Sequence, residues 1–387
     1  MSIKIGVLFY HSTVYPNMSA DLIKGFNAAL PTSLVKENFF QFFPEFVLQA
    51  TNKQVENTIQ KLLSFHQVDI VFGLLNYKAI PQLVPIFSRY QRIGLFSDMG
   101  EYIPYTNTIS DTIFFNSFQL WQSEYAMGMW AQKQFGDKGS VAMGFFDCGY
   151  HLQNAFRQGT VIAGSSEIDY TVMYDPGTHH TDIAFKTNQF IDALDDTNLP
   201  SYVHGIFCGY EAIDFLKAYR HSKLYGKVPL IISAHMAAED ILEQVDIDME
   251  LFSASMYNYH SPDSVNQKFK EQYLFATGEK PTIFSLMGYE LGLGLLETMP
   301  ALQKKDLKSV ANTLKSIHIK SPRGVRNFYA DSNYALPIID IEKINIKNKI
   351  IHKIVIEQGR ALRYDHAVYD EIHKEHLSGW QNPYLCV

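Results

Sequence analysis

Hydrophobic runs of strand length alternate with amphipathic stretches of helix length along the first quarter of the chain. Strands are expected at 3–10, 46–49, 69–72 and 93–96. Helices are expected between them, at 19–30, 53–65 and 79–89, where apolar positions recur every three or four residues. Strands that alternate with helices of this length predict right-handed βαβ units and a parallel sheet.

The alternation restarts after a long expected helix at 118–135. A second sheet is predicted from strands at 141–145, 170–173, 204–207 and 230–233, with helices at 152–163, 182–194, 211–219 and 239–244. The last third is expected to hold a strand at 251–257, helices at 262–277, 285–302 and 310–317, and a β-rich end at 325–328, 336–344 and 350–356. A chain of 387 residues is too long for one ordinary core, so we expect two lobes.

One unit, a strand followed by a polar and aromatic loop and then an amphipathic helix, occurs twice. It lies at about 4–30 and again at about 140–162. In open α/β sheets, ligands bind at the carboxyl ends of the strands, where these loops lie. Two such edges, one in each lobe, can close around one small molecule. The repeat therefore predicts a ligand-binding clamp rather than a catalyst.

Composition narrows the class of protein and of partner. The chain is 47% hydrophobic and 19% charged, with a net charge of −7 and no long basic run, which argues against a direct nucleic-acid partner. The sequence contains no run of 18 or more apolar residues, so we expect no membrane insertion. The three cysteines show no metal-binding spacing, and we expect neither a cofactor nor a metal. Cys148 and Cys208 are expected as two buried thiols, with a disulfide between them as the alternative.

Motifs that would indicate an enzyme are missing or explained otherwise. Gly288, Gly292 and Gly294 fall inside an expected helix, so we interpret them as packing positions rather than a dinucleotide loop. His179 and His180 follow an evident turn and are interpreted as a solvated loop rather than metal ligands. Cys148 lacks an evident base that would make it a nucleophile.

Seven segments, in order, resemble the type I periplasmic-binding-protein family in its leucine/isoleucine/valine and amide/urea branch. Among them are IKIGVLF followed by SADLIKGFNAAL, VDIVFGLLNYKAIPQLVPIF, GSVAMGFFDCGYHLQNAFRQG and IKSPRGVRNFYADSNYALPIIDI. The resemblance covers most of the chain. It implies an α/β fold of two Rossmann-like lobes with parallel sheets, joined by a hinge of three crossovers. The N-terminal lobe would comprise 1–118 plus 257–330, and the C-terminal lobe 119–256 plus 331–387.

The candidate ligand-binding residues lie in loops at the expected strand ends. The resemblance implies that Tyr150 stacks on ligand and that Tyr210 and Glu211 contact it. Structural roles, such as a core tyrosine, a helix cap or an ordinary turn, are the alternatives for each residue. The full set is Ser12, Tyr15, Leu75, Asn76, Tyr77, Phe96, Ser97, Asp98, Tyr150, Tyr210, Glu211 and His235.

The first-lobe loops depart from those of the family's amino-acid binders, which use small hydroxyl residues to hold a carboxylate. Here the loops carry bulkier residues together with Asp98 and Glu101. An uncharged amide-like solute, or one with an amino group, suits such an acidic and aromatic lining better.

The family implies the substrate-binding component of an ABC transporter, with a permease as partner and a periplasmic location once a leader is removed. A cytosolic sensor of amide-type ligands, working with a regulatory protein, is the alternative, because the sequence enters a strand almost at once. An enzyme on a two-lobed scaffold, and the ligand domain of a transcription regulator, are further alternatives.

Overall fold

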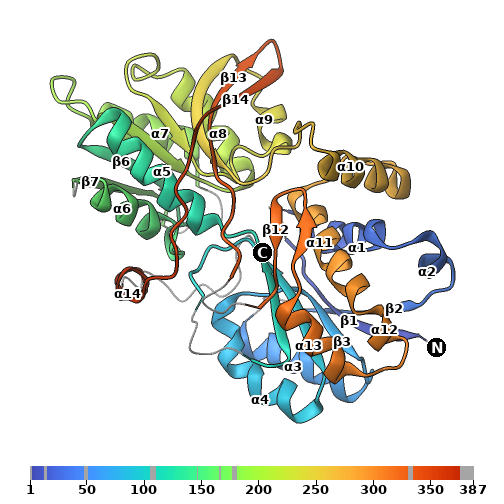
Figure 1. The fold of residues 1–387 in the computed structure, drawn as a ribbon. Coiled ribbons are helices and arrows are strands. Elements are labelled where there is room, and N and C mark those ends of the chain that lie inside the picture. Colours follow the sequence, from blue (N-terminus) through green and yellow to red (C-terminus); the bar gives the residue numbers. More distant parts are fainter. Residues whose placement is uncertain are drawn as a thin grey trace.

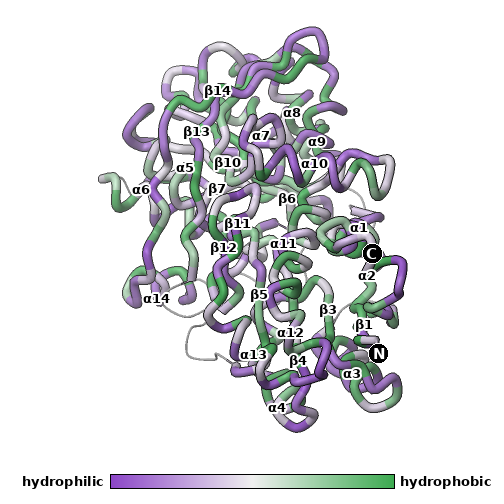
Figure 2. Tube along the Cα trace, turned by 45° about the vertical axis from the view of Figure 1, so that its right-hand side comes forward, coloured by the Kyte–Doolittle hydropathy of each residue, from purple (hydrophilic) through white to green (hydrophobic). Residues whose placement is uncertain are grey.

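The chain folds into two α/β lobes, one above the other in Figure 1. This computed structural model describes residues 2–12, 15–47, 51–104, 110–145, 147–164, 167–176, 181–329 and 334–374. Hydrophobic segments follow the inner strands of both sheets, and hydrophilic segments lie mainly on the outside (Figure 2). Within the described residues, no helix combines the length and the apolar character needed to span a membrane.

The first lobe is built on a five-stranded parallel sheet with the order β2-β1-β3-β4-β5. Its strands are β1 (Ile3–Phe9), β2 (Phe40–Phe46), β3 (Ile70–Leu74), β4 (Ile93–Asp98) and β5 (Ile113–Ser117). Its helices are α1 (Met18–Ala29), α2 (Thr32–Lys36), α3 (Asn52–Ser64), α4 (Ile80–Tyr90), α10 (Ser264–Thr277), α11 (Ile283–Glu297), α12 (Met299–Leu302) and α13 (Leu307–Ser316). A short hairpin of β11 (Ile319–Ser321) and β12 (Gly324–Arg326) lies against α11.

The second lobe is built on a seven-stranded sheet with the order β14-β13-β10-β9-β8-β6-β7. Its strands are β6 (Gly139–Gly144), β7 (Ile168–Met173), β8 (Tyr202–Ile206), β9 (Leu230–Ile232), β10 (Met249–Ser255), β13 (Asp340–Lys347) and β14 (Ile350–Gln358). Its helices are α5 (Leu120–Phe135), α6 (Leu152–Ile162), α7 (Ile183–Asp192), α8 (Gly209–Arg220), α9 (Glu239–Val245) and α14 (His366–Lys374). In the two large sheets, only the pairs β10–β13 and β13–β14 are antiparallel among the described residues, so the expectation of mostly parallel sheets in both lobes is confirmed.

The chain passes between the lobes three times. The passages lie between β5 and α5, between β10 and α10, and between β12 and β13. The expected hinge of three crossovers therefore matches the fold. On this distribution of elements we propose the lobe boundaries given above, 1–118 plus 257–330 and 119–256 plus 331–387.

One expected strand of the first sheet is misplaced. A strand was predicted at 46–49, but the strand of this region is β2 (Phe40–Phe46), which ends where the prediction begins; residues 48–49 lie outside the described residues. Pro44 within this segment has no backbone N–H, so it cannot donate a hydrogen bond to a neighbouring strand. An inner strand, which is paired on both sides, does not tolerate this loss. Since β2 is at the edge of the sheet and pairs only with β1, the proline is tolerated there.

Helices α1 and α11 pack with their backbones in direct contact. A Cβ added at Gly25 would lie 1.9 Å from the Ser285 carbonyl oxygen, and one added at Gly288 would lie 1.9 Å from the Leu22 carbonyl oxygen. These distances leave no room for a side chain. The interpretation of Gly288 as a packing position is therefore confirmed.

We expect Gly288→Leu to lower the free energy of unfolding by about 3 kcal/mol, the upper end of the usual effect of overpacking. The added side chain meets backbone rather than a movable side chain, so the two helices must separate. Glu297→Leu places the same side chain at an exposed position of the same helix and is the matched control. Urea unfolding of both variants measures the difference, and equal midpoints would contradict this packing.

Candidate functional site

The carboxyl edges of the two sheets face each other across the molecule. We call the segments that follow β1, β3 and β4 in the first lobe, and β6, β8 and β9 in the second, the inter-lobe seam. The Tyr102 hydroxyl donates to the Gly149 carbonyl at 3.0 Å, and the His151 N–H donates to the Glu101 carbonyl at 2.9 Å. These bonds tie the segment after β4 to the segment after β6.

Tyr15, which follows β1, makes a second connection between the lobes. Its ring packs edge-on against Phe284 of the first lobe, with the ring centroids 5.3 Å apart. Its hydroxyl is hydrogen-bonded to the backbone of Gly209, at the start of α8 in the second lobe. Burial, together with the nearby Cys208, raises the pKa of Tyr15 well above its ordinary value, so the hydroxyl stays neutral. Tyr15 thus lies at the contact between the two carboxyl edges.

Aromatic rings line the middle of the seam. Tyr150 is buried, and its ring meets the edge of Tyr102 at a centroid distance of 5.6 Å. On the Tyr102 ring, the Lys78 ammonium lies 4.0 Å from the centroid, a cation–π contact. Burial lowers the pKa of Lys78. The region therefore combines aromatic faces with one half-buried cation.

Two buried acids lie on the first-lobe side of the seam. Burial raises the pKa of Asp98 to about 7, although the Ser117 hydroxyl and the Gly100 N–H stabilise the carboxylate. Burial, and then the charge of Asp98, raises the pKa of Glu101 well above its ordinary value. Both groups are thus held mostly protonated below neutral pH, and a cation or a hydrogen-bond donor placed beside them would stabilise their charged forms.

Three further titratable groups lie on the second-lobe side. Burial raises the pKa of Asp147 well above its ordinary value, with a smaller contribution from the charge of Glu211. Burial raises the pKa of Glu211 to about 7. It also lowers the pKa of His235 to about 4, so that the imidazole is neutral near pH 7. Burial thus favours the uncharged form of all three groups, which carries both a hydrogen-bond donor and an acceptor.

Polar groups without partners mark the ends of β3 and β4. Asn76 is buried, and its side-chain oxygen accepts from the Lys78 N–H at 2.8 Å, while its Nδ2 has no hydrogen-bond partner among the described residues. The Ser97 hydroxyl is likewise buried and unpartnered within the described ranges. Such groups are rare in protein interiors, and a bound ligand is one of the ways in which they gain partners.

Several of the candidate residues have structural roles. The Ser12 hydroxyl accepts from the Tyr15 N–H at 3.0 Å, shortly after β1. Tyr77 stacks on Phe115 with a centroid distance of 4.3 Å, and Phe96 packs against Phe87 of α4. Two candidate residues are left: Leu75 is buried, and Tyr210 is 38% exposed.

A cavity of about 220 Å3 opens between the lobes. Its wall is shared by Asp240 of α9, Tyr257 of the second crossover and Thr282 at the start of α11. Ala234, the neighbour of His235, also lines it, so the cavity adjoins the seam. Its size is below the usual 300–1,000 Å3 of ligand pockets, which favours a small solute.

The sequence analysis did not single out Asp147 or Cys208 as site residues, although it identified the loops that carry them. The Cys208 thiol donates to Asp147 Oδ1 at 2.9 Å. Cys148 and Cys208 are both free thiols, as expected, but only Cys208 is buried, whereas Cys148 is partly exposed. His179 and His180 lie outside the described residues. Strand-end position was the only available signal for Asp147.

A model of the periplasmic binding protein family matches residues 48–336. Comparison with curated proteins gives no match. Among solved structures, the chain is similar to an ABC transporter substrate-binding protein from Sphaerobacter thermophilus, at 19% identity and a TM-score of 0.73, covering 92% of this chain and 98% of that one.

Two further solved structures contain ligands. A solute-binding protein from R. palustris, in complex with 4-hydroxybenzoate, shares 16% identity over 95% of this chain and 99% of its own, with a TM-score of 0.73. The branched-chain amino acid binding protein LivJ from Streptococcus pneumoniae, in complex with isoleucine, shares 14% identity over 92% and 99%, with a TM-score of 0.69. At these identities the likeness shows the fold.

Proposed function

Because this chain belongs to the periplasmic binding protein family, we propose that it is the substrate-binding component of an ABC transporter, which closes its two lobes on a small polar solute. The observation that carries the proposal is the facing pair of carboxyl edges. The contacts of Tyr15 with Gly209 and of Tyr102 with Gly149 join them. Hinge closure around a bound ligand uses such contacts between lobes.

The expected solute carries N–H groups together with a carbonyl, as an amide does, or an amino group. Glu101 and Asp98 are acceptors when ionised, and the unpartnered Nδ2 of Asn76 donates to a carbonyl. Tyr150 and Tyr102 exclude water and supply aromatic faces. The R. palustris and S. pneumoniae proteins named above are in complex with molecules that carry a carboxylate. The acidic first-lobe loops of this chain favour a different headgroup.

The proposed partner is a membrane permease, and the proposed place of work is the periplasm. No observation favours the alternative of a cytosolic sensor, since the family match and the structures named above are of binding and transport proteins. For the same reason we do not propose an enzyme.

A thermal-shift panel of amides, urea, amino acids, amines and benzoates tests the function. A solute present at about 100 times its dissociation constant adds about 2.7 kcal/mol of stability, so a true ligand gives a clear shift. The proposal predicts that amides or amines give the largest shift. A shift from benzoates alone would contradict the ligand class. If the protein carried no bound solute and no added solute of any class gave a shift, the function itself would be contradicted.

Tyr150→Ala is expected to weaken the affinity for that solute by about 1–3 kcal/mol, because a buried aromatic side chain is lost from the seam. Tyr170→Ala removes a tyrosine that is 40% exposed on β7 and is the matched control. Calorimetric titration of the two variants separates the effects. Equal affinities in both would remove Tyr150 from the site.

A further inference from the structure

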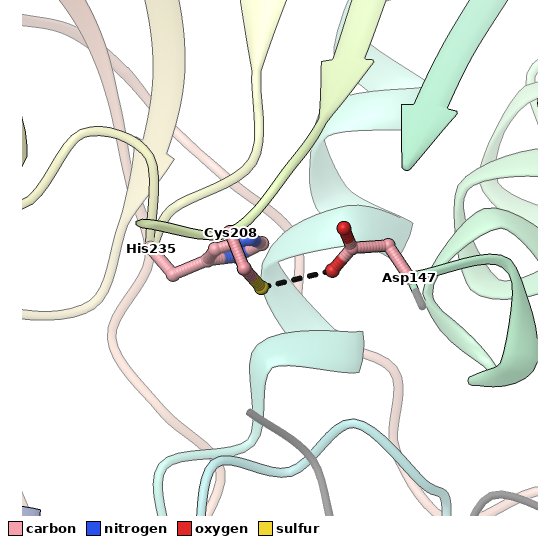
Figure 3. Close-up of side chains that lie close together, drawn as sticks. All are labelled: Asp147, Cys208 and His235. Carbon is pink, nitrogen blue, oxygen red and sulfur yellow. Dashed lines mark hydrogen bonds between the residues drawn. The ribbon is translucent and has the colours of Figure 1, made fainter. Parts of the chain in front are cut away.

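Three chemically distinct side chains meet at the carboxyl edge of the second sheet. Asp147 follows β6, Cys208 follows β8 and His235 follows β9, and these strands are neighbours in the sheet. Their ligand atoms all lie within 4.8 Å of one another, and all three residues are buried. Figure 3 shows the carboxyl group, the thiol and the imidazole pointing toward a common region.

The hydrogen bonds of this cluster orient its donor atoms. His235 Nε2 lies 3.0 Å from the Phe207 carbonyl oxygen, which can only accept, so Nε2 carries the proton and Nδ1 carries the lone pair. A backbone carbonyl that fixes the tautomer in this way is the usual outer partner of a metal-binding histidine. The Cys208 thiol points its proton at Asp147 Oδ1, 2.9 Å away. A metal ion would take the place of that shared proton.

We propose that Asp147, Cys208 and His235 bind a thiophilic divalent metal ion, such as Zn2+ or Co2+. An aspartate, a thiolate and a neutral imidazole are suitable ligands for Zn2+. Tetrahedral coordination, with bonds of about 2.0–2.3 Å, requires ligand atoms about 3.4–3.8 Å apart. From separations of up to 4.8 Å, the ligand atoms therefore need to approach by at most about 1.4 Å, whereas Cys208 Sγ and Asp147 Oδ1, now 2.9 Å apart, need to separate by about 0.5–0.9 Å.

The charge of the site also balances. A divalent ion with one carboxylate and one thiolate has no net charge, so burying the assembled centre avoids the cost of burying an isolated ion. The thiol proton is released on binding. The fourth coordination position is left to solvent, to a solute donor or to the Tyr15 hydroxyl, which approaches from the first lobe beside Gly209.

All three proposed ligands belong to the second lobe, so the inference goes beyond the proposed function and does not require lobe closure. Neither does it depend on the amide or amine solute. The spacing of the three residues along the chain follows no metal-binding motif, because the strand order alone brings them together.

The test is a titration of the full chain, freed of metal by a chelator and of any purification tag, with ZnCl2 by calorimetry and with CoCl2 by absorption. We expect one ion per chain and a thiolate-to-cobalt charge-transfer band. Cys208→Ser should weaken binding by more than about 100-fold and abolish that band, since loss of even an outer partner costs 10–100-fold. Cys148→Ser is the matched control, because the Cys148 thiol donates to the Phe145 carbonyl and lies outside the cluster.

His235→Ala provides a second variant and should also weaken binding, which keeps the test valid if Cys208→Ser fails to fold. Absence of one-to-one binding, absence of the thiolate band, or loss of binding in Cys148→Ser alone would overturn the proposal. The solute panel is run on the same metal-free protein. A solute shift without metal binding overturns the metal site and leaves the proposed function standing, whereas metal binding without any solute shift supports the site and contradicts the solute function.

Discussion

Replacing Glu290 by Gln is expected to lower the free energy of unfolding by about 3–5 kcal/mol, because it leaves buried arginine without its carboxylate. Glu290 accepts from Arg323 Nε at 2.9 Å and from its NH2 group at 2.5 Å, and both side chains are almost fully buried. Arg323 in turn donates to the Ser117 carbonyl at 3.3 Å. The pair therefore fixes the first crossover of the hinge to helix α11.

Chemical unfolding of Glu290→Gln and of the double variant Glu290→Leu with Arg323→Met measures this effect. The double variant should regain most of the lost stability, since an apolar pair of similar size replaces both charges. Lys315→Ala, which breaks the exposed pair with Asp111, is the control and should cost at most about 1 kcal/mol. A cost for Glu290→Gln no larger than that of the control would show that the buried pair is not required.

The second large effect that we expect is a decrease in the free energy of unfolding as the pH rises, caused by ionisation of Glu342. This residue of β13 is fully buried, and burial raises its pKa from 4.5 to about 7. Between these values the folded state keeps a proton that the unfolded state has released, so the free energy of unfolding decreases as the pH rises. The decrease is complete above about pH 7 and amounts to roughly 3 kcal/mol.

Glu342→Gln should remove this component. The variant is expected to match the unchanged protein near pH 4.5 and to exceed its stability at about pH 8 by roughly 3 kcal/mol. Glu357→Gln, at an exposed position of the neighbouring β14, should leave the pH profile unchanged. Unfolding curves measured over this pH range test the prediction. If the free energy of unfolding changed with pH in the same way in Glu342→Gln and in the unchanged protein, the assignment to Glu342 would be refuted.

The sequence pattern predicted most elements because each carries one clear periodicity. The continuous apolar run of β1 and the amphipathic spacing of α1 are found where they were expected. Strand β2 was misplaced because Pro44 and a cluster of phenylalanines obscure its pattern. Strand β5 was missed because its short apolar run lies between polar residues. Both are edge strands of the first sheet, whereas the edge strands of the second sheet, β7 and β14, lie where they were expected.

The candidate site could be predicted only to the level of loops. Strand ends locate Tyr15, Tyr150 and His235 in the seam, because parallel strands place their carboxyl ends at one edge. The order of strands in the sheet is not visible in the sequence, so the meeting of Asp147, Cys208 and His235 could not be foreseen. The sequence also does not tell which face of β4 meets the seam. Phe96 and Ser97 point to opposite faces of this strand, and both are buried.

The most direct test of the account is small-angle X-ray scattering with and without the solute that gives the largest thermal shift. A binding protein that closes its lobes on that solute must become more compact, with a smaller radius of gyration at saturation. The account predicts this decrease, and it predicts a smaller decrease in Tyr150→Ala at the same solute concentration. An identical scattering profile at proven saturation would contradict closure of the two lobes around a ligand.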